Sequence, residues 1–328
     1  MQQSENEDHA KLSPSSSDIW LNCPGSLINQ PEDEGSTFAL EGTAAHAMAE
    51  HCLTKQIDAT AAPAHPDWER FDSPEMRDHV QTYLDYVRRH VGDGELFIEQ
   101  RLQIHPMFGV WGTADAVVVG KDGVIHLADL KYGQGVLVEP ESTQLLLYAI
   151  GAAASFTWLS DVPVHTVTAH IVQPRRNNLV SKSYSVEELA EWVRTNESRI
   201  ARAANGVEAY EAGAHCKWCR KRAVCKTRAE YNLATAMLDF DTIDCAPADP
   251  TQIDEAKLVQ IFKRLPVLEK WIKDVESEVG RRSHDHVPAG LKWVAGKNMR
   301  FITDPTAAAG VLEVAGINPY AERKMLGF

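Results

Sequence analysis

The chain has 328 residues, of which 44% are hydrophobic and 24% are charged, as is ordinary for a soluble globular protein with a sizeable core. No apolar run approaches the length of a membrane span, and the polar N-terminal segment MQQSENEDHAKLSPSSS does not resemble a signal peptide. The net charge of −13 argues against a protein that coats nucleic acid, so any such binding needs a local basic surface.

Three helices are predicted in the first third of the chain. Ser13-Pro14 marks the start of a short helix, because serine caps helix N-termini and proline fits the first turn. A second helix contains His46, in EGTAAHAMAEHCL. Ser73-Pro74 starts the third, whose apolar residues recur at helical spacing and are assigned to the core: Met76, Val80, Tyr83, Leu84 and Val87.

The middle of the chain alternates between strands and helices. Apolar, β-branched stretches predict strands around 95–104, 109–119, 123–131 and 165–173. A helix with Gln144 and Tyr148 on one face separates the last two strands, and Ser185 with Glu188 forms a capping box for a later helix that contains Trp192. This α-β-β-β-α-β order predicts an α/β (α+β) fold with a mixed central sheet flanked by helices.

The C-terminal part is expected to form an accessory region over 236–328, after a first domain over 1–235. Residues 239–250 are acidic and contain proline, which suits a linker. The segment 258–275 is amphipathic at helical spacing, with an interruption expected at Pro266. Its apolar stripe is expected to pack within the chain, with a subunit interface as the alternative. A hairpin around 296–298 and a helix from residue 304 follow.

Two aspartates and a lysine carry the strongest chemical signal. Asp115 lies in GTADAVVV, and Asp129 and Lys131 lie in HLADLKYG, so both carboxylates fall on one predicted hairpin. Alternate residues of a strand share a face, so Asp129 and Lys131 point the same way. Paired carboxylates can hold Mg²⁺ or Mn²⁺ and a lysine can orient water, which suits metal-assisted phosphodiester hydrolysis. The pattern D-x-K is also common on solvated strand edges, so the motif alone does not decide.

With His46 upstream and Gln144 and Tyr148 downstream, the chain resembles the PD-(D/E)XK nuclease superfamily, in particular its RecB-type and CRISPR-adaptation branch. The resemblance implies a restriction-endonuclease-like core in which Lys131 is the catalytic lysine and Gln144 and Tyr148 support the site and the DNA strand. It also implies a set of metal ligands: His46, Asp115, Asp129 and the backbone carbonyl of Leu130. Asp129 stands where many members carry glutamate.

Four cysteines give a second signal. Cys216, Cys219 and Cys225 form C-x2-C-x5-C, and Cys23 stands alone in WLNCPGS. Three clustered cysteines need a fourth ligand, which Cys23 could supply, but spacing alone leaves Zn²⁺ and a [4Fe–4S] cluster open. The resemblance favours [4Fe–4S], because iron–sulfur members of this branch take one cysteine before the nuclease core and three after it. The cluster would then staple the two ends of the domain together.

The remaining cysteines and histidines are expected to be structural. We predict a buried thiol at Cys52 and a loop thiol at Cys245. His215, next to the cysteine triplet, could hydrogen-bond near the cluster. Four further histidines are expected to be strand-surface or core residues rather than ligands: His105, His126, His165 and His170.

A basic surface for DNA is predicted beside the cysteines. The segment 217–228 contains six basic residues and no acid, and a second pair of arginines lies in VQPRRNN. For any single base a solvated charged surface remains the simpler explanation, but the concentration favours a DNA-holding surface. The predicted DNA-binding residues are Arg175, Arg176, Lys217, Arg220, Lys221 and Arg222. Trp218 lies among them and is expected to cover the cluster.

The resemblance extends to a phage- and prophage-borne subfamily through SPSSSDIWLNCPGS, GTADAVVV and DLKYGQGV. It implies an exonuclease that processes single-stranded DNA or duplex ends for recombination or replication, in the cytoplasm of a bacterial or phage-infected cell. A single-strand annealing or single-strand-binding protein would be the partner. The alternatives are a non-catalytic DNA-binding or scaffold protein with a nuclease fold, and a Cys₄-zinc adaptor.

Overall fold

The computed structural model describes residues 10–31, 37–157, 162–236 and 255–292. Contacts divide the chain into two compact units, Met1–Glu276 and Ser277–Phe328. The boundary predicted at residue 236 lies beside 237–254 and stays a prediction. Four predictions lie outside the described residues: the linker, the loop thiol at Cys245, the hairpin around 296–298 and the last helix.

One five-stranded sheet organises the first unit. Its strands run in the order β1-β2-β3-β4-β5, and β3 and β4 pair in parallel while all other neighbours are antiparallel. The strands are β1 Glu95–His105, β2 Val110–Val119, β3 Val124–Leu130, β4 Thr166–Gln173 and β5 Asn178–Ser185. Helix α4, Thr143–Ser155, makes the crossover that two parallel neighbours require.

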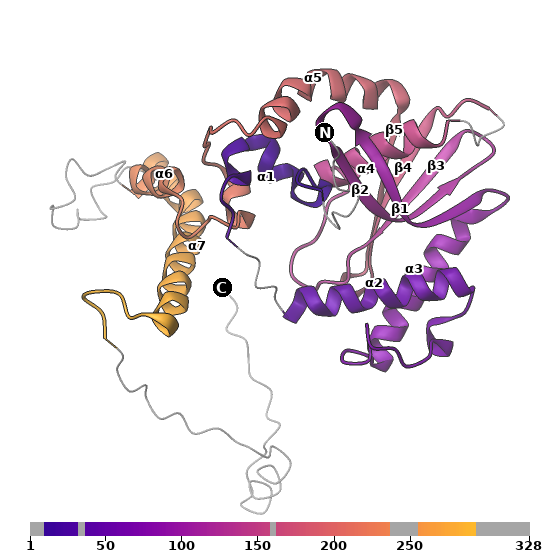
Figure 1. Cartoon of the computed structure of the whole chain (residues 1–328), viewed down its shortest axis with the longest axis horizontal. Coiled ribbons are helices and arrows are strands. Elements are labelled where there is room, and N and C mark those ends of the chain that lie inside the picture. Colours follow the sequence, from indigo (N-terminus) through magenta and orange to yellow (C-terminus); the bar gives the residue numbers. More distant parts are fainter. Residues whose placement is uncertain (1–9, 32–36, 158–161, 237–254, 293–328) are drawn as a thin grey trace, which may run out of the picture. The chain divides into compact units, whose positions relative to one another are not determined.

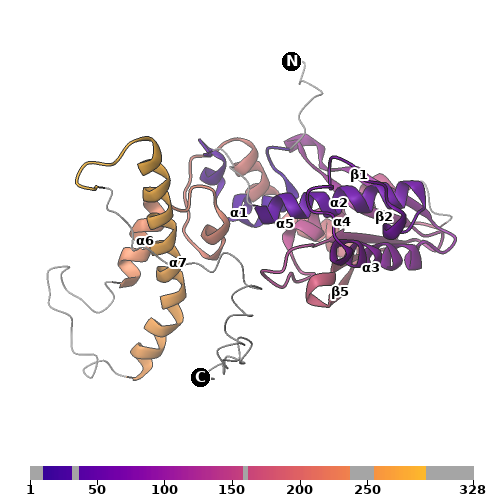
Figure 2. The same cartoon turned by 90° about the horizontal axis from the view of Figure 1, so that it is seen from below.

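Helices cover both faces of the sheet (Figures 1 and 2). Helices α2 (Thr37–Lys55) and α3 (Pro74–Val91) lie on one side, and α1 (Ser17–Asn22), α4 and α5 (Val186–Ala204) lie on the other. Each side has its own buried core. The core under α2 and α3 contains Met48, Val80 and Leu130, and the core on the other side contains Trp20 and Leu127. The predicted mixed sheet flanked by helices is therefore confirmed.

Short 3-10 helices and one extra strand complete the unit. The 3-10 turns are η1 Pro14–Ser16, η2 Pro24–Leu27, η3 Ala59–Ala61, η4 Pro106–Phe108, η5 Pro174–Arg176 and η6 Ala214–Trp218. Strand β5 was not among the predicted strands, because NLVSKSYS is mostly polar and does not alternate regularly, and it lies at the sheet edge, where little of it needs to be apolar.

The helix starts follow local capping chemistry in two of three places. The side chain of Ser73 accepts a hydrogen bond from the N–H of Met76, with Pro74 at the first position of α3. Ser185 and Glu188 form the predicted capping box at the start of α5. Ser13 makes no capping hydrogen bond from its side chain, and only a 3-10 turn begins at Pro14, so the prediction of a capped helix there is wrong in detail.

The second half of the described chain contains α6 (Lys226–Ala236) and α7 (Glu255–Asp285). Helix α7 runs through Pro266 without a break, so the predicted interruption is wrong. A proline removes one backbone hydrogen bond and costs roughly 3 kcal/mol, which a helix of 31 residues can bear. Phe262 is 71% exposed and Ile272 is 51% exposed, so within the described part of the chain these two members of the apolar stripe are not buried, and the expected packing of the stripe stays a prediction. Among the described helices, none combines the length and apolarity needed to cross a membrane.

Candidate active site and cysteine pocket

Three carboxylates lie in one row across three neighbouring strands. In the antiparallel registers, Ile98 and Gln100 of β1 pair with Ala116 and Ala114 of β2, and Ala116 pairs with Ala128 of β3. Continuing these registers puts Glu99 opposite Asp115 and Asp115 opposite Asp129. Like charges opposite one another destabilise a sheet, and Asp129 is only 3% exposed. Such a row therefore needs positive charge close by.

Part of that positive charge comes from His46 on α2. Its Nδ1 lies 3.4 Å from Oδ2 of Asp115, and potential ligand atoms of His46, Glu99 and Asp115 lie within 4.8 Å of one another. Burial alone would lower the pKa of His46, but the charges of Asp115 and Asp129 outweigh it and raise that pKa to about 9. The protonated imidazole thus offsets the negative charge of the carboxylates, as a bound cation would.

Lys131 supplies the rest of the positive charge from the end of β3. Its Nζ lies 2.8 Å from Oδ2 of Asp129 and donates a hydrogen bond of 3.2 Å to Oε1 of Gln144. The Nε2 of Gln144 donates in turn to Oδ1 of Asp129 at 3.3 Å. The three side chains form a closed ring that fixes the position of the ammonium group. Gln144 can reach this ring because it lies in the first turn of α4.

The two aspartates have different electrostatic surroundings. Burial raises the pKa of Asp129 above its usual value in spite of Lys131. Burial would also raise the pKa of Asp115, but His46, Lys131 and the N–H of Leu130, which donates to Oδ2 at 2.7 Å, hold it below the usual value. Asp115 is therefore the more firmly ionised carboxylate of the pair.

The donor set suits a hard divalent cation. Carboxylate oxygens are the ligands preferred by Mg²⁺ and Mn²⁺, and an imidazole nitrogen favours Mn²⁺. Oδ2 of Asp129 is buried and receives no hydrogen bond of normal geometry, although Lys131 is close to it. A buried acceptor of this kind is usually satisfied by a partner, so the residues present fit a metal ion. The predicted role of the Leu130 carbonyl stays a prediction.

The structure thus brings together six predicted site residues and adds one that was missed. Those six are His46, Asp115, Asp129, Lys131, Gln144 and Tyr148. Tyr148 is linked to the site electrostatically, because burial and then the charges of the two aspartates raise its pKa. The addition is Glu99, whose pKa is raised to about 7 by burial and by Asp115. Glu99 was missed because ELFIEQRLQI contains several charged residues, and nothing in that pattern distinguishes the one that faces Asp115.

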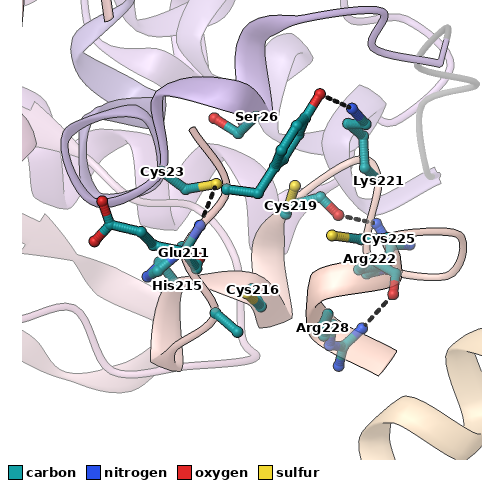
Figure 3. A pocket seen from close by; sticks show the side chains of 12 residues that line it. Cys23, Ser26, Glu211, His215, Cys216, Cys219, Lys221, Arg222, Cys225 and Arg228 are labelled. Carbon is teal, nitrogen blue, oxygen red and sulfur yellow. Dashed lines mark hydrogen bonds between the residues drawn. The ribbon is translucent and has the colours of Figure 1, made fainter. Parts of the chain in front are cut away.

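A pocket lined by four cysteines lies elsewhere in the same unit (Figure 3). Cys23 follows α1, Cys216 lies in η6, and Cys219 and Cys225 follow it before α6. Two backbone N–H groups donate to sulfur atoms, from Glu211 to Cys23 at 3.5 Å and from Gly213 to Cys216 at 3.4 Å. Residues nearly two hundred positions apart in sequence therefore meet around one space.

The four sulfur atoms do not form a close set of ligand atoms in this structure. Among the described residues, the sets of three ligand atoms within 4.8 Å of one another contain no cysteine sulfur. A tetrahedral zinc ion with Zn–S bonds of about 2.3 Å would bring its sulfurs to within roughly 4 Å of one another. Burial raises the pKa of Cys219, and the other three cysteines raise it further. The pocket thus brings the four predicted ligand cysteines to one place, and which metal group they hold stays a prediction.

The neighbours of the pocket agree in part with expectation. His215 is buried, its Nε2 lies 3.0 Å from the carbonyl oxygen of Glu211, and a hydrogen bond with Cys23 raises its pKa. Cys52 is fully buried, as predicted. Trp218 is 56% exposed and does not line the pocket, so the expectation that it covers the cysteines is wrong.

The six predicted DNA-binding residues differ in exposure. Arg175 pairs with Glu41 at 3.1 Å and lies over the ring of Tyr132, Lys221 donates to the carbonyl of Ile28 at 3.1 Å, and Arg222 pairs with Asp274 at 3.2 Å. The side chains of Arg176, Lys217 and Arg220 are exposed, and Lys217 lies over the ring of Trp218. A DNA-binding role for all six stays a prediction.

Similarity to solved structures is distant. A protein from Eubacterium rectale whose crystal structure is described as that of a "Putative exonuclease" has 14% identity and a TM-score of 0.37, over 77% of this chain and 98% of that chain. A protein described as SSO0001 has 12% identity and a TM-score of 0.32, over 69% of this chain and 90% of that chain. Likeness at this level does not indicate an activity.

A sequence-family match is far more extensive. The family described as "Protein of unknown function (DUF2800)" matches residues 9–328, which takes in both the carboxylate row and the four cysteines. Because the match covers nearly the whole sequence, the chain belongs to the DUF2800 family.

Proposed function

We propose that this protein is a metal-dependent deoxyribonuclease of the PD-(D/E)XK type. The observation that carries the proposal is the row of Glu99, Asp115 and the buried Asp129, with Lys131 fixed beside it. A row of acids and an anchored lysine is costly for a fold to maintain. It is the arrangement that phosphodiester hydrolysis with a divalent cation requires.

Each residue has a defined task in this proposal. Asp115 and Asp129, together with His46 and the carbonyl of Leu130, would hold Mg²⁺ or Mn²⁺. When bound, the cation would activate a water molecule and neutralise phosphate charge. Lys131 would orient that water, because its Nζ is held between Asp129 and Gln144 rather than free in solvent.

The helix that carries Gln144 would also support the DNA strand. Gln144 keeps Lys131 in place through its Oε1 and Asp129 through its Nε2. Tyr148 lies one turn further along α4, where its hydroxyl stays protonated because burial raises its pKa. It can therefore donate a hydrogen bond to a phosphate oxygen beside the carboxylate row.

We further propose that Cys23, Cys216, Cys219 and Cys225 hold a [4Fe–4S] cluster. What supports a shared metal group is that all four cysteines line one pocket and that Glu211 and Gly213 donate hydrogen bonds to two of the sulfurs. The choice of the cluster over Zn²⁺ rests on the sequence resemblance. Three finer parts of the proposal rest on the sequence resemblance. They are the RecB-type branch, an exonuclease role at DNA ends in phage-type recombination or replication, and an annealing or single-strand-binding protein as partner.

The assay that tests the activity is cleavage of end-labelled single- and double-stranded DNA with Mg²⁺ or Mn²⁺. We expect Lys131→Ala to lower the cleavage rate roughly 100-fold or more, and Asp115→Ala and Asp129→Ala to abolish cleavage. Lys55→Ala is the control, because Lys55 is exposed at the end of α2 and should leave the rate unchanged.

Two outcomes would point to the alternatives. A wild-type protein that binds DNA but cleaves neither substrate in either metal would favour a non-catalytic scaffold with a nuclease fold. Zinc in place of iron after anaerobic purification, together with absent cleavage, would favour the Cys₄-zinc adaptor. Full activity in the Lys131→Ala protein would remove the PD-(D/E)XK assignment.

A further inference from the structure

Three histidines from three different elements converge away from the carboxylate row. His90 lies in the last turn of α3, His126 in β3 and His170 in β4. One ring nitrogen from each lies within 4.8 Å of the other two. The ring centroids are 4.7 Å apart for His90 and His170, 4.9 Å for His90 and His126, and 5.3 Å for His126 and His170.

This cluster is separate from the candidate active site. His126 and Asp129 are three residues apart in β3, so their side chains lie on opposite faces of the sheet. The parallel register pairs Ala128 with His170, which puts His126 and His170 on the same face of neighbouring strands. That face is covered by α3, which contributes His90.

Tyr86 orients two of the three rings. The Nδ1 of His90 lies 2.8 Å from the backbone carbonyl oxygen of Tyr86. A carbonyl can only accept, so this Nδ1 carries the hydrogen and leaves Nε2 as a lone-pair donor. The Nδ1 of His170 lies 2.9 Å from the hydroxyl of the same tyrosine. Metal-binding histidines usually have their second nitrogen bound to an outer partner in this way.

The free nitrogens face one another. His126 Nδ1 and His170 Nε2 are 3.0 Å apart, so without a metal ion a single hydrogen must lie between them. With His90 Nε2 left without the hydrogen, each ring can offer one nitrogen to a shared ion.

We propose that His90, His126 and His170 form a Zn²⁺ site that ties α3 to strands β3 and β4. Three imidazole nitrogens with oriented outer hydrogen bonds are a donor set that zinc accepts with a fourth position left for water or an added ligand. Neutral nitrogen donors favour zinc over Mg²⁺, which the carboxylate row would take. The two metal sites would thus use side chains of β3 that point to opposite faces of the sheet, His126 for one and Asp129 for the other.

Zinc stoichiometry of the full chain tests this site directly. Zinc would be titrated against a chromophoric chelator in wild type and in His90→Ala and His126→Ala, whose side chains are only partly buried and whose loss should leave the fold intact. We expect each variant to lose one tightly bound equivalent. The matched control is His165→Ala, an exposed histidine just before β4, which should keep it.

Two further measurements separate a metal site from a packed histidine cluster. Tyr86→Phe removes only the hydroxyl that faces His170, and we expect it to weaken that zinc equivalent about 10- to 100-fold. Added Zn²⁺ should raise the melting temperature of wild type and His165→Ala but not of His90→Ala. Cobalt substitution of wild type should add a visible absorption band that His126→Ala lacks. Equal zinc stoichiometry in wild type, His90→Ala and His126→Ala would overturn the proposal.

Discussion

Glu99 has a backbone conformation that residues other than glycine rarely adopt inside a strand, with φ of 45°. Such a conformation costs on the order of 1–3 kcal/mol and persists where the surrounding structure enforces it. Here it accompanies the approach of the Glu99 carboxylate to His46 and Asp115. We infer that the strain is tolerated because it adds a third acid to the row.

Glu99→Gln is expected to weaken metal binding while preserving the shape of the side chain. Removing one negative charge from the row should raise the Mn²⁺ concentration needed for half-maximal DNA cleavage about tenfold, with the rate recovering at high Mn²⁺. Glu95→Gln is the control, since Glu95 is exposed in the same strand. The same metal dependence in Glu99→Gln and wild type would assign Glu99 a structural role only.

His46→Ala is expected to change the choice of metal. The imidazole is the one nitrogen ligand in the proposed set, and nitrogen favours Mn²⁺ over Mg²⁺. Its removal should therefore reduce Mn²⁺-supported cleavage more than Mg²⁺-supported cleavage, measured as the ratio of the two rates. His51→Ala, five residues further along α2, should leave the ratio unchanged. Unaltered activity of His46→Ala in both metals would make His46 an ordinary helix residue.

At the scale of elements, the sequence predicts most of what surrounds the site. The alternation in GTADAVVV and the turn before GVIHLADL fixed β2 and β3 in the predicted positions, and the aspartates with them. Periodic patterns worked there because both strands are buried. Strand β5 was not predicted, because an edge strand buries few side chains and so lacks a clear apolar pattern. Glu99 was not predicted as a site residue, because a left-handed φ inside a strand depends on tertiary contacts rather than on the local sequence.

Helix α7 shows a second limit of sequence patterns. Its Asp274 is buried and meets Arg228 at 2.6 Å, and Arg228 also donates to the carbonyl of Arg222. Both arginines line the cysteine pocket. The sequence indicates these bases as a DNA-binding surface, yet Arg228 is 3% exposed and serves to join α7 to the cysteine segment. Spacing along the chain could not distinguish these roles, because Asp274 is remote in sequence.

Asp274→Ala is expected to destabilise the cysteine segment. It leaves Arg228 buried without its carboxylate, which typically costs about 3–5 kcal/mol. We expect a lower melting temperature and a lower iron content in the purified protein. Glu269→Ala is the control, because Glu269 lies on the same helix and pairs with the exposed Lys273. Equal melting temperatures for the two variants would show that the buried pair does not stabilise the segment.

At the scale of the whole molecule, the net charge of −13 restricts where DNA could bind. The net negative charge of the protein repels DNA. DNA would therefore need the exposed basic side chains near the cysteine pocket, which include Lys217 and Arg220. The cysteine segment would then have two tasks, holding a cluster and presenting positive charge. Both depend on the same short stretch of chain keeping its shape.

The last prediction follows from how far apart in sequence the cysteines are. Cys23 precedes the sheet and the other three follow it, so a shared cluster closes a loop of nearly two hundred residues. Closing so long a loop removes unfolded-state entropy worth about 5 kcal/mol, and the binding energy of the cluster becomes folding energy. Alanine at any of the four should therefore lower solubility and iron content together.

Cys52→Ala is the matched control, because Cys52 is a fully buried thiol outside the pocket. It should keep the iron and sulfide content of wild type, measured after anaerobic purification alongside visible absorption. The four pocket variants should lose both iron and sulfide even when expressed at low temperature. A full iron complement in Cys23→Ala would exclude Cys23 as a ligand and, with it, the stapling of the two ends of the chain.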